Sequence, residues 1–226
     1  VSHYDAVVRG FEDVAGGRRG PGVLILDAGC GPGNLLKRLG AFGKVMGMDD
    51  HLQALRFCRM KHVAPVLRSS LVRLPFRDEA FDHVFCVEVL EHLDDDRAAL
   101  REIKRVLKPG GLVVITVPAL RILWSYHDEW SGHRRRYSRA QLREKGETAG
   151  LRLVLCRYIK IFSFVPLLIF RMIKKASGSK NHDFFGMPRA GNILFRKIFA
   201  LETALAFRCP FPFGSSMITI FKKESL

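Results

Sequence analysis

Long hydrophobic runs are missing from this sequence of 226 residues. The most apolar stretch, Ile161–Ile173, is interrupted by Arg171 and preceded by Lys160, whereas a helix needs about 20 apolar residues to span a bilayer. The first residues mix polar and charged side chains, so we predict no secretory signal. Ile161–Ile173 is therefore expected to be a buried element or an interfacial one.

Paired cysteines are missing as well. The five cysteines are scattered, odd in number and without a CxxC pair, so neither a disulfide framework nor a zinc site is predicted. The eight histidines are dispersed and show no pattern with paired carboxylates, and we therefore predict no metal ligands. This composition fits a reducing, cytoplasmic compartment.

Acidic residues are scarce in only one half of the chain. The net charge is +15 overall, of which residues 1–120 contribute +2 and residues 121–226 contribute +13. A partner that carries phosphate, or an anionic membrane surface, would be attracted to the C-terminal half.

Strand-like and helix-like segments alternate from residue 23 onward. The expected strands are 23–27, 44–49, 63–68, 81–87, 112–117, 151–158 and 217–222, and the expected helices are 34–39, 53–61, 94–107 and 139–149. The alternation predicts an α/β fold with a doubly wound, seven-stranded, mostly parallel sheet.

One domain is expected to cover residues 1–226. We divide it into an N-terminal helical region (1–20), a core (21–158), an apolar and basic insertion (159–214) and a final strand (215–226). The insertion is expected to be helical, because residues 193–207 carry apolar side chains at helical spacing.

A glycine-rich turn follows the first expected strand. Gly29, Gly31 and Gly33 allow a tight turn and a close approach of the backbone to a ligand. Asn34 stands after Gly33, so the G-x-G-x-x-G spacing of nicotinamide oxidoreductases is not met. Asp49 ends the second strand, where a carboxylate can accept both hydroxyls of a ribose. The pattern predicts a ligand that contains adenosine.

Four segments resemble the class I S-adenosylmethionine-dependent methyltransferases, particularly those that act on small molecules. They read DAGCGPGN (27–34), MGMDD (46–50), RLPFRDEAFDHVFCVEVLEHL (73–93) and REIKRVLKPGGLVVITVP (101–118). The resemblance implies a Rossmann-like methyltransferase fold, with S-adenosyl-L-methionine as cofactor and S-adenosyl-L-homocysteine as product. It places Asp27 near the methionine amino group and Asp49 at the ribose hydroxyls. The expected cofactor-binding positions are Asp27, Gly29, Cys30, Gly31, Gly33, Asp49, Asp50, Ser70, Leu71, Val87 and Glu88.

Two of these positions carry a qualification. Asp50 is expected to serve as a helix cap rather than as a ribose contact. The family often has an acidic residue for the adenine amino group where this chain has Ser69-Ser70-Leu71, so Ser70 and the Leu71 backbone are the expected substitutes. The family's recurring turn LEH (90–92) is expected to serve in capping and packing at least as readily as in chemistry.

The segment DEWSGHRRRYSRAQL (128–142) is similar to one in bacterial methyltransferases that accompany envelope-polysaccharide and lipid-linked-glycan genes. His127 and His133 are the candidate general bases, because they follow the fifth strand and histidine titrates near neutrality. A hydrogen-bonded structural role is the alternative for each. A dense group of cationic side chains with one aromatic is expected to bind the acceptor, because arginine binds phosphate or carboxylate with two hydrogen bonds. Its members are Arg134, Arg135, Arg136 and Tyr137. A solvated surface, or closure over the cofactor, is the alternative role of this group.

The sequence thus predicts a methyltransferase for a small-molecule, glycan or lipid-linked acceptor. We expect the protein in the cytoplasm, where the apolar and basic insertion would contact the anionic inner surface of the membrane. The alternative is that the insertion packs on the sheet and contacts no membrane. An RNA methyltransferase and a non-catalytic cofactor-binding protein are the other functions considered. A nucleic-acid acceptor is disfavoured because the fourth strand ends in VEVLEH and not in the Asn/Asp-Pro-Pro-aromatic stretch of amino-methylating enzymes. No oligomeric state is predicted.

Overall fold

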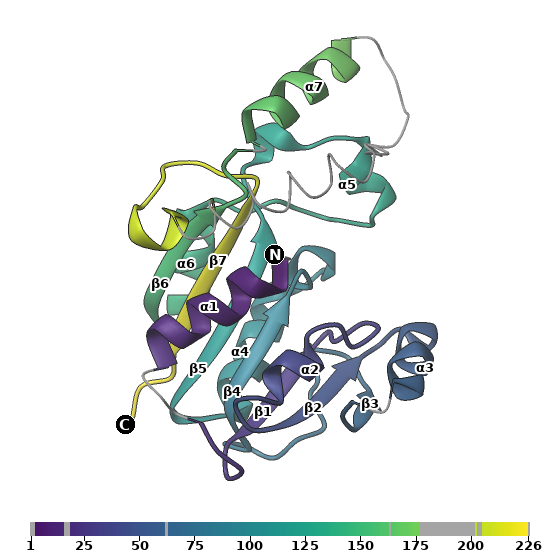
Figure 1. Ribbon diagram of the computed structural model, residues 1–226. Helices are drawn as coiled ribbons and strands as arrows, with labels where there is room; N and C mark the ends of the chain where they lie inside the picture. Colours follow the sequence, from purple (N-terminus) through teal and green to yellow (C-terminus); the bar gives the residue numbers. More distant parts are fainter. Residues whose placement is uncertain are drawn as a thin grey trace.

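The computed structural model describes residues 3–15, 19–61, 63–162, 164–176, 202 and 205–225. Its centre is a seven-stranded sheet in the order β3-β2-β1-β4-β5-β7-β6 (Figure 1). Strand β7 runs antiparallel to both neighbours and the other pairings are parallel, which confirms the predicted sheet. The strands are β1 (Leu24–Ala28), β2 (Lys44–Asp49), β3 (Val66–Arg68), β4 (Phe81–Val87), β5 (Leu107–Pro118), β6 (Arg152–Ile159) and β7 (Ser216–Lys222).

Helices cover both faces of the sheet. Helices α1, α2 and α3 bury apolar side chains on one face, and α4 and α6 do so on the other, as Figure 1 shows for α1 in front of the strands and α4 behind them. The helices are α1 (His3–Ala15), α2 (Leu36–Leu39), α3 (Leu52–Met60), α4 (Asp96–Val106), α5 (Tyr126–Trp130), α6 (Arg139–Thr148) and α7 (Phe164–Ala176), with 3₁₀ turns η1 (Leu90–His92) and η2 (Arg121–Leu123).

The sequence of α4 explains both its ends and its orientation. The Asp95 side chain accepts a hydrogen bond from the Ala98 amide at 2.8 Å, which caps the first turn. Leu100, Ile103 and Val106 recur at helical spacing and are fully buried, and each such side chain contributes about 1.5–3 kcal/mol through burial. The helix ends at Val106 because strand β5 starts at the next residue.

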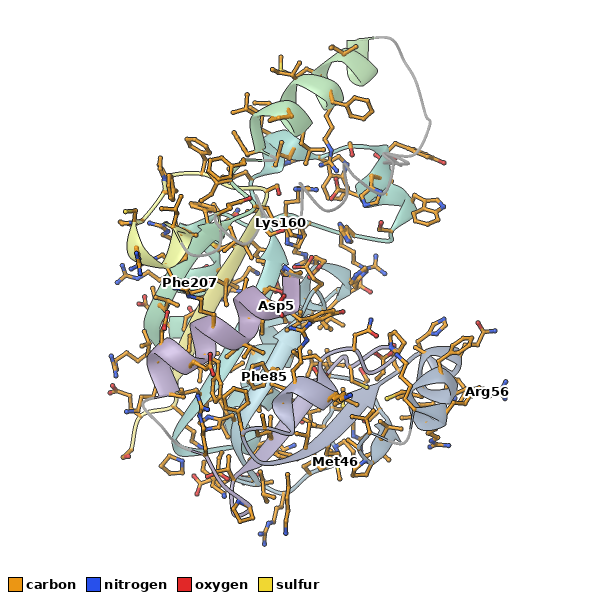
Figure 2. All side chains as sticks on the ribbon, in the orientation of Figure 1. Asp5, Met46, Arg56, Phe85, Lys160 and Phe207 are labelled. Carbon is orange, nitrogen blue, oxygen red and sulfur yellow. The ribbon has the colours of Figure 1, made fainter. Side chains whose placement is uncertain are left out.

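The core of the α1 face contains aromatic side chains. Phe85 of β4 lies beneath α1, whereas Arg56 of α3 lies at the outer edge of the molecule (Figure 2). The Phe85 and Phe11 rings are 5.1 Å apart and edge to face, a geometry that aromatic pairs favour. This contact fixes α1 on the sheet.

Several element boundaries differ from the predicted ones. Strand β5 begins at Leu107 rather than at residue 112, because Leu107 still pairs with Phe81 before the register shifts. Helix α2 is a single turn, 36–39, and starts later than predicted. Helix α5 and both 3₁₀ turns were not predicted, since segments of three to five residues are too short to show a hydrophobic period.

The expected insertion begins with helix α7, which lies beyond the sheet edge where β4 and β5 end (Figure 1). No helix within the described residues is both long enough and apolar enough to cross a membrane. The apolar stripe expected over 193–207 falls outside the described residues except at 202 and 205–207.

Candidate functional site

The glycine-rich turn lies at the carboxyl end of β1, where α/β folds bind ligands. Gly29, Gly31 and Gly33 have φ angles of 89°, 51° and 79°, a region that glycine adopts without strain. A Cβ atom on Gly29 would lie 2.2 Å from Cγ2 of Val89, whereas a Cβ atom on Gly31 would meet nothing within 4 Å. The turn is therefore packed at its base and open at Gly31.

Asp49 ties this turn to the end of β2. Its carboxylate accepts hydrogen bonds from the Gly31 and His51 amides, each at 2.8 Å. Each carboxylate oxygen has a further lone pair, so Asp49 can still accept hydroxyl groups. The Lys61 ammonium closes the far side of the turn by donating to the Pro32 carbonyl at 2.6 Å and to Asn34 Oδ1 at 3.0 Å.

Asp27 provides a buried negative group beneath the turn. It is 2 % exposed, and its Oδ2 atom has no hydrogen-bond partner among the described residues. Burial and the nearby charge of Asp49 raise the pKa of Asp27 to about 7. A buried carboxylate without a partner is costly unless a cation compensates it, so these residues fit a ligand that brings an ammonium group.

The remaining cofactor candidates lie at the same edge of the sheet but differ in what they present. Ser70 is exposed and Leu71 buried just after β3, while Val87 ends β4. The Cys30 thiol is buried in the core below the turn, so only its backbone remains for a ligand. The predicted cap at Asp50 is wrong, because His51 is the N-cap of α3 and accepts from the Ala54 amide. Cofactor contacts by these residues remain predictions.

Glu88 follows β4 in a left-handed backbone conformation, with φ of 55°. Its Oε1 atom lies 3.3 Å from Nε2 of His3, which also lies 3.1 Å from the Thr116 hydroxyl. Desolvation alone would raise the pKa of Glu88, but the His3 hydrogen bond and charge, with the Lys160 charge, hold it well below its usual range. Glu88 is therefore an anion beside the predicted methionine position.

Arg134 and Arg135 do not project freely, as an acceptor-binding group would. Arg134 donates from Nε to the His92 carbonyl and forms an ion pair with Asp94, both at 3.0 Å. Arg135 donates to the Leu93 and Asp94 carbonyls, each at 3.0 Å. These contacts fasten the segment after β5 to the turn after β4.

Arg136 and Tyr137 are engaged in the interior. Arg136 donates from Nε to Asp128 Oδ1 at 2.8 Å and from Nη1 to the Ala119 carbonyl at 3.0 Å. The Tyr137 hydroxyl is buried and donates to Asp96 Oδ2 at 2.7 Å. We assign both side chains to holding the two loops together, because neither presents a polar group to a ligand in this arrangement.

The candidate base His133 is oriented by a buried carboxylate. Its Nδ1 atom lies 2.9 Å from Oδ1 of Asp128, which has no exposed surface. Although burial would raise the pKa of Asp128, hydrogen bonding to His133 and the charge of Arg136 lower it to about 2. Asp128 therefore remains ionised and favours the His133 tautomer with its proton on Nδ1 and a free lone pair on Nε2. His127 lies on α5, with its ring 6.4 Å from that of Trp130.

The structure also assembles a cluster that the sequence does not predict. One potential ligand atom each from Glu91, His92 and His133 lies within 4.8 Å of the other two. Burial and the charge of Glu88 raise the pKa of Glu91 well above its usual range. Partial desolvation of the ring and the charge of His133 lower the pKa of His92. The adjacent pair Glu91-His92 was the available signal, but His133 is 41 positions further along the chain.

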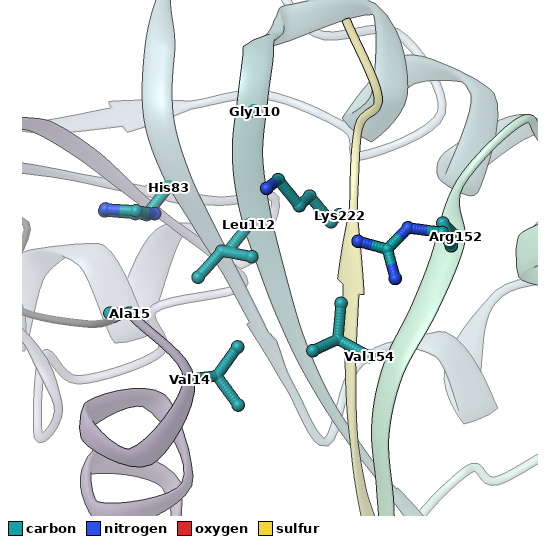
Figure 3. Close-up of a pocket in the computed structure, with 8 residues that line it drawn as sticks. All are labelled: Val14, Ala15, His83, Gly110, Leu112, Arg152, Val154 and Lys222. Carbon is teal, nitrogen blue, oxygen red and sulfur yellow. The ribbon is translucent and has the colours of Figure 1, made fainter.

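A pocket of about 210 Å³ lies elsewhere, at the amino ends of β4 and β5 (Figure 3). His83, Leu112 and Lys222 are among the side chains that line it. It is at the opposite sheet edge from the glycine turn, so we do not assign the cofactor to it.

Comparisons with known proteins show which sequences and structures this chain is similar to. Residues 26–115 match the family described as Methyltransferase domain. A tRNA (carboxymethyluridine(34)-5-O)-methyltransferase of Arabidopsis thaliana is 36 % identical over 126 residues, which are 49 % of this chain and 31 % of that protein. A demethylmenaquinone methyltransferase of Staphylococcus aureus (strain MRSA252) is 36 % identical over 101 residues, 41 % of this chain and 42 % of that protein.

A solved structure shares the fold over nearly the whole chain. Phosphoethanolamine N-methyltransferase 2 of Haemonchus contortus, in complex with S-adenosyl-L-methionine, matches with a TM-score of 0.66 at 16 % identity, over 98 % of this chain and 52 % of that one. The chain spans less than half the length of the two curated relatives.

Proposed function

We propose that this chain, in which residues 26–115 match the family described as Methyltransferase domain, transfers a methyl group from S-adenosyl-L-methionine to a small-molecule, glycan or lipid-linked acceptor. The observation that carries the proposal is the glycine turn, open at Gly31 and fastened to Asp49. The cofactor supplies a methyl group that its positively charged sulfur already activates.

The residues of the chain bind and orient the two reactants. Asp49 is placed to accept the ribose hydroxyls, and the buried Asp27 to compensate the methionine ammonium group. Glu88 adds a second anion at the end of β4. On the acceptor side, His133 is held by Asp128 with its Nε2 lone pair available, and His127 is the other candidate to accept a proton. Holding two groups in line is the main contribution that such a site makes to the rate.

The surface of α7 favours an amphipathic acceptor. Val165, Ile169, Met172 and Ile173 are between 49 % and 63 % exposed, and their spacing places them on one face of the helix. Arg171 points inward instead, because its guanidinium contacts the Leu123 carbonyl. Arg171 therefore adds no positive charge to the edge of this apolar face, although the C-terminal half as a whole carries the excess charge.

Liposome flotation tests this part of the proposal. We expect the protein to float with anionic vesicles at low salt and to lose that binding in Ile169→Glu. The matched control is Phe57→Glu, which adds the same charge at a side chain that is 61 % exposed on α3. No flotation of the wild type, or an equal loss in the control, would contradict a membrane-facing α7.

A transfer assay tests the activity itself. The protein is incubated with methyl-labelled S-adenosyl-L-methionine and separate lipid, glycan and tRNA fractions, with Asp49→Asn as the inactive reference. We expect label in the lipid or glycan fraction. Label in tRNA would favour the RNA alternative, which the Arabidopsis relative and the net charge of +15 make worth including. Binding without transfer to any fraction would favour a non-catalytic protein.

A further inference from the structure

We infer that Glu91, His92 and His133 bind a divalent transition-metal cation beside the glycine turn. One potential ligand atom from each residue lies within 4.8 Å of the other two. Ligands at about 2.0–2.2 Å from one ion are about 3–4 Å apart, so the group needs to contract by about 1 Å. Rotation of the exposed His92 side chain can supply such a movement.

Glu91 is the strongest indication that a cation belongs here. The residue is 0 % exposed, and neither of its carboxylate oxygens has a hydrogen-bond partner among the described residues. Burying a carboxyl group without partners is costly. A metal ion coordinated by one of its oxygens would satisfy that group.

His133 is prepared to be a ligand. Its Nδ1 atom is 2.9 Å from Oδ1 of the buried Asp128, and Arg136 pairs with the same carboxylate at 2.8 Å. Metal-binding histidines typically donate their second nitrogen to a carboxylate in this way, which fixes the tautomer and the ring orientation. The Nε2 lone pair of His133 is then free for the ion, and with the ion bound it no longer serves as the candidate base of the proposed function.

The backbone holds the ligands together and leaves one side open. The Arg134 amide donates to the Glu91 carbonyl at 2.7 Å, which joins the turn that carries Glu91 and His92 to the loop that carries His133. The two imidazole rings are 4.9 Å apart at 74°. His92 is exposed and His133 is half-buried, so solvent can reach the cluster from the side of the histidines, and a catalytic metal site needs such an open side.

Two imidazoles and one carboxylate suit Mn²⁺, Fe²⁺, Co²⁺ or Zn²⁺ better than Ca²⁺. Val89, two residues before Glu91, packs against Gly29, so the ion would lie close to the cofactor turn. This part of the inference rests on the proposed function: the ion would hold a hydroxyl oxygen of the acceptor and favour loss of its proton to solvent. The oxygen lone pair then forms the bond to the methyl carbon, while the carbon–sulfur bond breaks and its electron pair stays on sulfur.

Binding of Mn²⁺ alone tests the site without any methyl transfer. The chelator-treated chain is titrated with Mn²⁺, and the free ion is followed by electron paramagnetic resonance. We expect one ion per chain, bound at least about 10-fold more weakly by His92→Gln. The matched control is His51→Gln, which removes an exposed histidine outside the cluster and is expected to bind like the wild type. Circular dichroism confirms folding, and His133→Gln is the second variant if His92→Gln does not fold.

The outcomes separate this inference from the proposed function. Absence of Mn²⁺ binding, or equal weakening by both histidine variants, overturns the metal site. Calorimetry with S-adenosyl-L-homocysteine on the same chelated protein reports on the cofactor site independently. Binding of S-adenosyl-L-homocysteine without binding of Mn²⁺ overturns the metal site and leaves the proposed function standing. Binding of Mn²⁺ without binding of S-adenosyl-L-homocysteine overturns the proposed function and supports the metal site.

Discussion

Replacement of Asp27 by Asn should make the free protein more stable above neutral pH and weaken its cofactor binding. Asp27 is 2 % exposed and its pKa is raised from 3.8 to about 7, by burial first and then by Asp49. The native state thus holds this proton more tightly than the unfolded chain does. The resulting stabilisation is fully present below about pH 4 and is lost as the pH rises through about 7.

The size of the effect follows from the shift. About three pKa units at 1.36 kcal/mol each give about 4 kcal/mol of lost stability above pH 7, of which about 2.5 kcal/mol falls between pH 5 and pH 8. Asn is neutral throughout this range. The difference in the free energy of unfolding between Asp27→Asn and the wild type should therefore move by about 2.5 kcal/mol in favour of the variant.

Urea denaturation from pH 5 to pH 8 measures this difference, with Asp13→Asn as a control at an exposed carboxylate on α1. Glu91 and Glu202 also have raised pKa values, but both remain in each protein and cancel in the comparison. Calorimetry on the same variant should show weaker binding of S-adenosyl-L-homocysteine, because its ammonium group loses a carboxylate. A difference in stability that does not change with pH would refute the reasoning.

Three further substitutions test the packing around the site. Gly29→Ala should destabilise the protein by about 2 kcal/mol or more, because the new Cβ atom would lie 2.2 Å from Val89 and the backbone φ at this position is 89°. Thermal melting should show that Val89→Ala partly restores the lost stability. No restoration would argue against this contact. Tyr137→Phe should cost about 1–3 kcal/mol in urea denaturation, since Asp96 loses a donor at 2.7 Å, and an unchanged midpoint would contradict a structural role. Lys61→Met should change the free energy of unfolding by less than about 0.5 kcal/mol. It should still weaken the binding of S-adenosyl-L-homocysteine several-fold in calorimetry, because the glycine turn loses the Lys61 ammonium donor. Binding equal to that of the wild type would show that the turn does not depend on Lys61.

Local sequence patterns were sufficient for the sheet and for the glycine turn at its edge. The mostly apolar segments that form β2 and β4 have the predicted bounds, 44–49 and 81–87, because strands inside a parallel sheet are short and rich in apolar residues. Gly31 and Asp49 meet because parallel topology brings the ends of β1 and β2 to one edge. The proximity of these two residues can therefore be predicted from the order of the strands alone, without knowing how distant side chains pack.

The acceptor side was less accessible to sequence reasoning. The arginines at 134–136 suggested anion binding, but carbonyl groups and carboxylates of the protein itself satisfy them. The proximity of Glu91, His92 and His133 depends on how two loops dock, and no periodic pattern records it. Arg171 shows the same limit, since its inward direction is set by the Leu123 carbonyl on a different element.

The central claim is that the glycine turn and Asp49 bind the cofactor, and calorimetry with S-adenosyl-L-homocysteine tests it most directly. The account predicts one site per chain in the wild type and in Asp13→Asn. It predicts binding weaker by about 10- to 100-fold in Asp49→Asn, since a hydrogen bond to a charged group is worth about 1.5–3 kcal/mol. Absence of binding by the wild type, or undiminished binding by Asp49→Asn, would contradict the account.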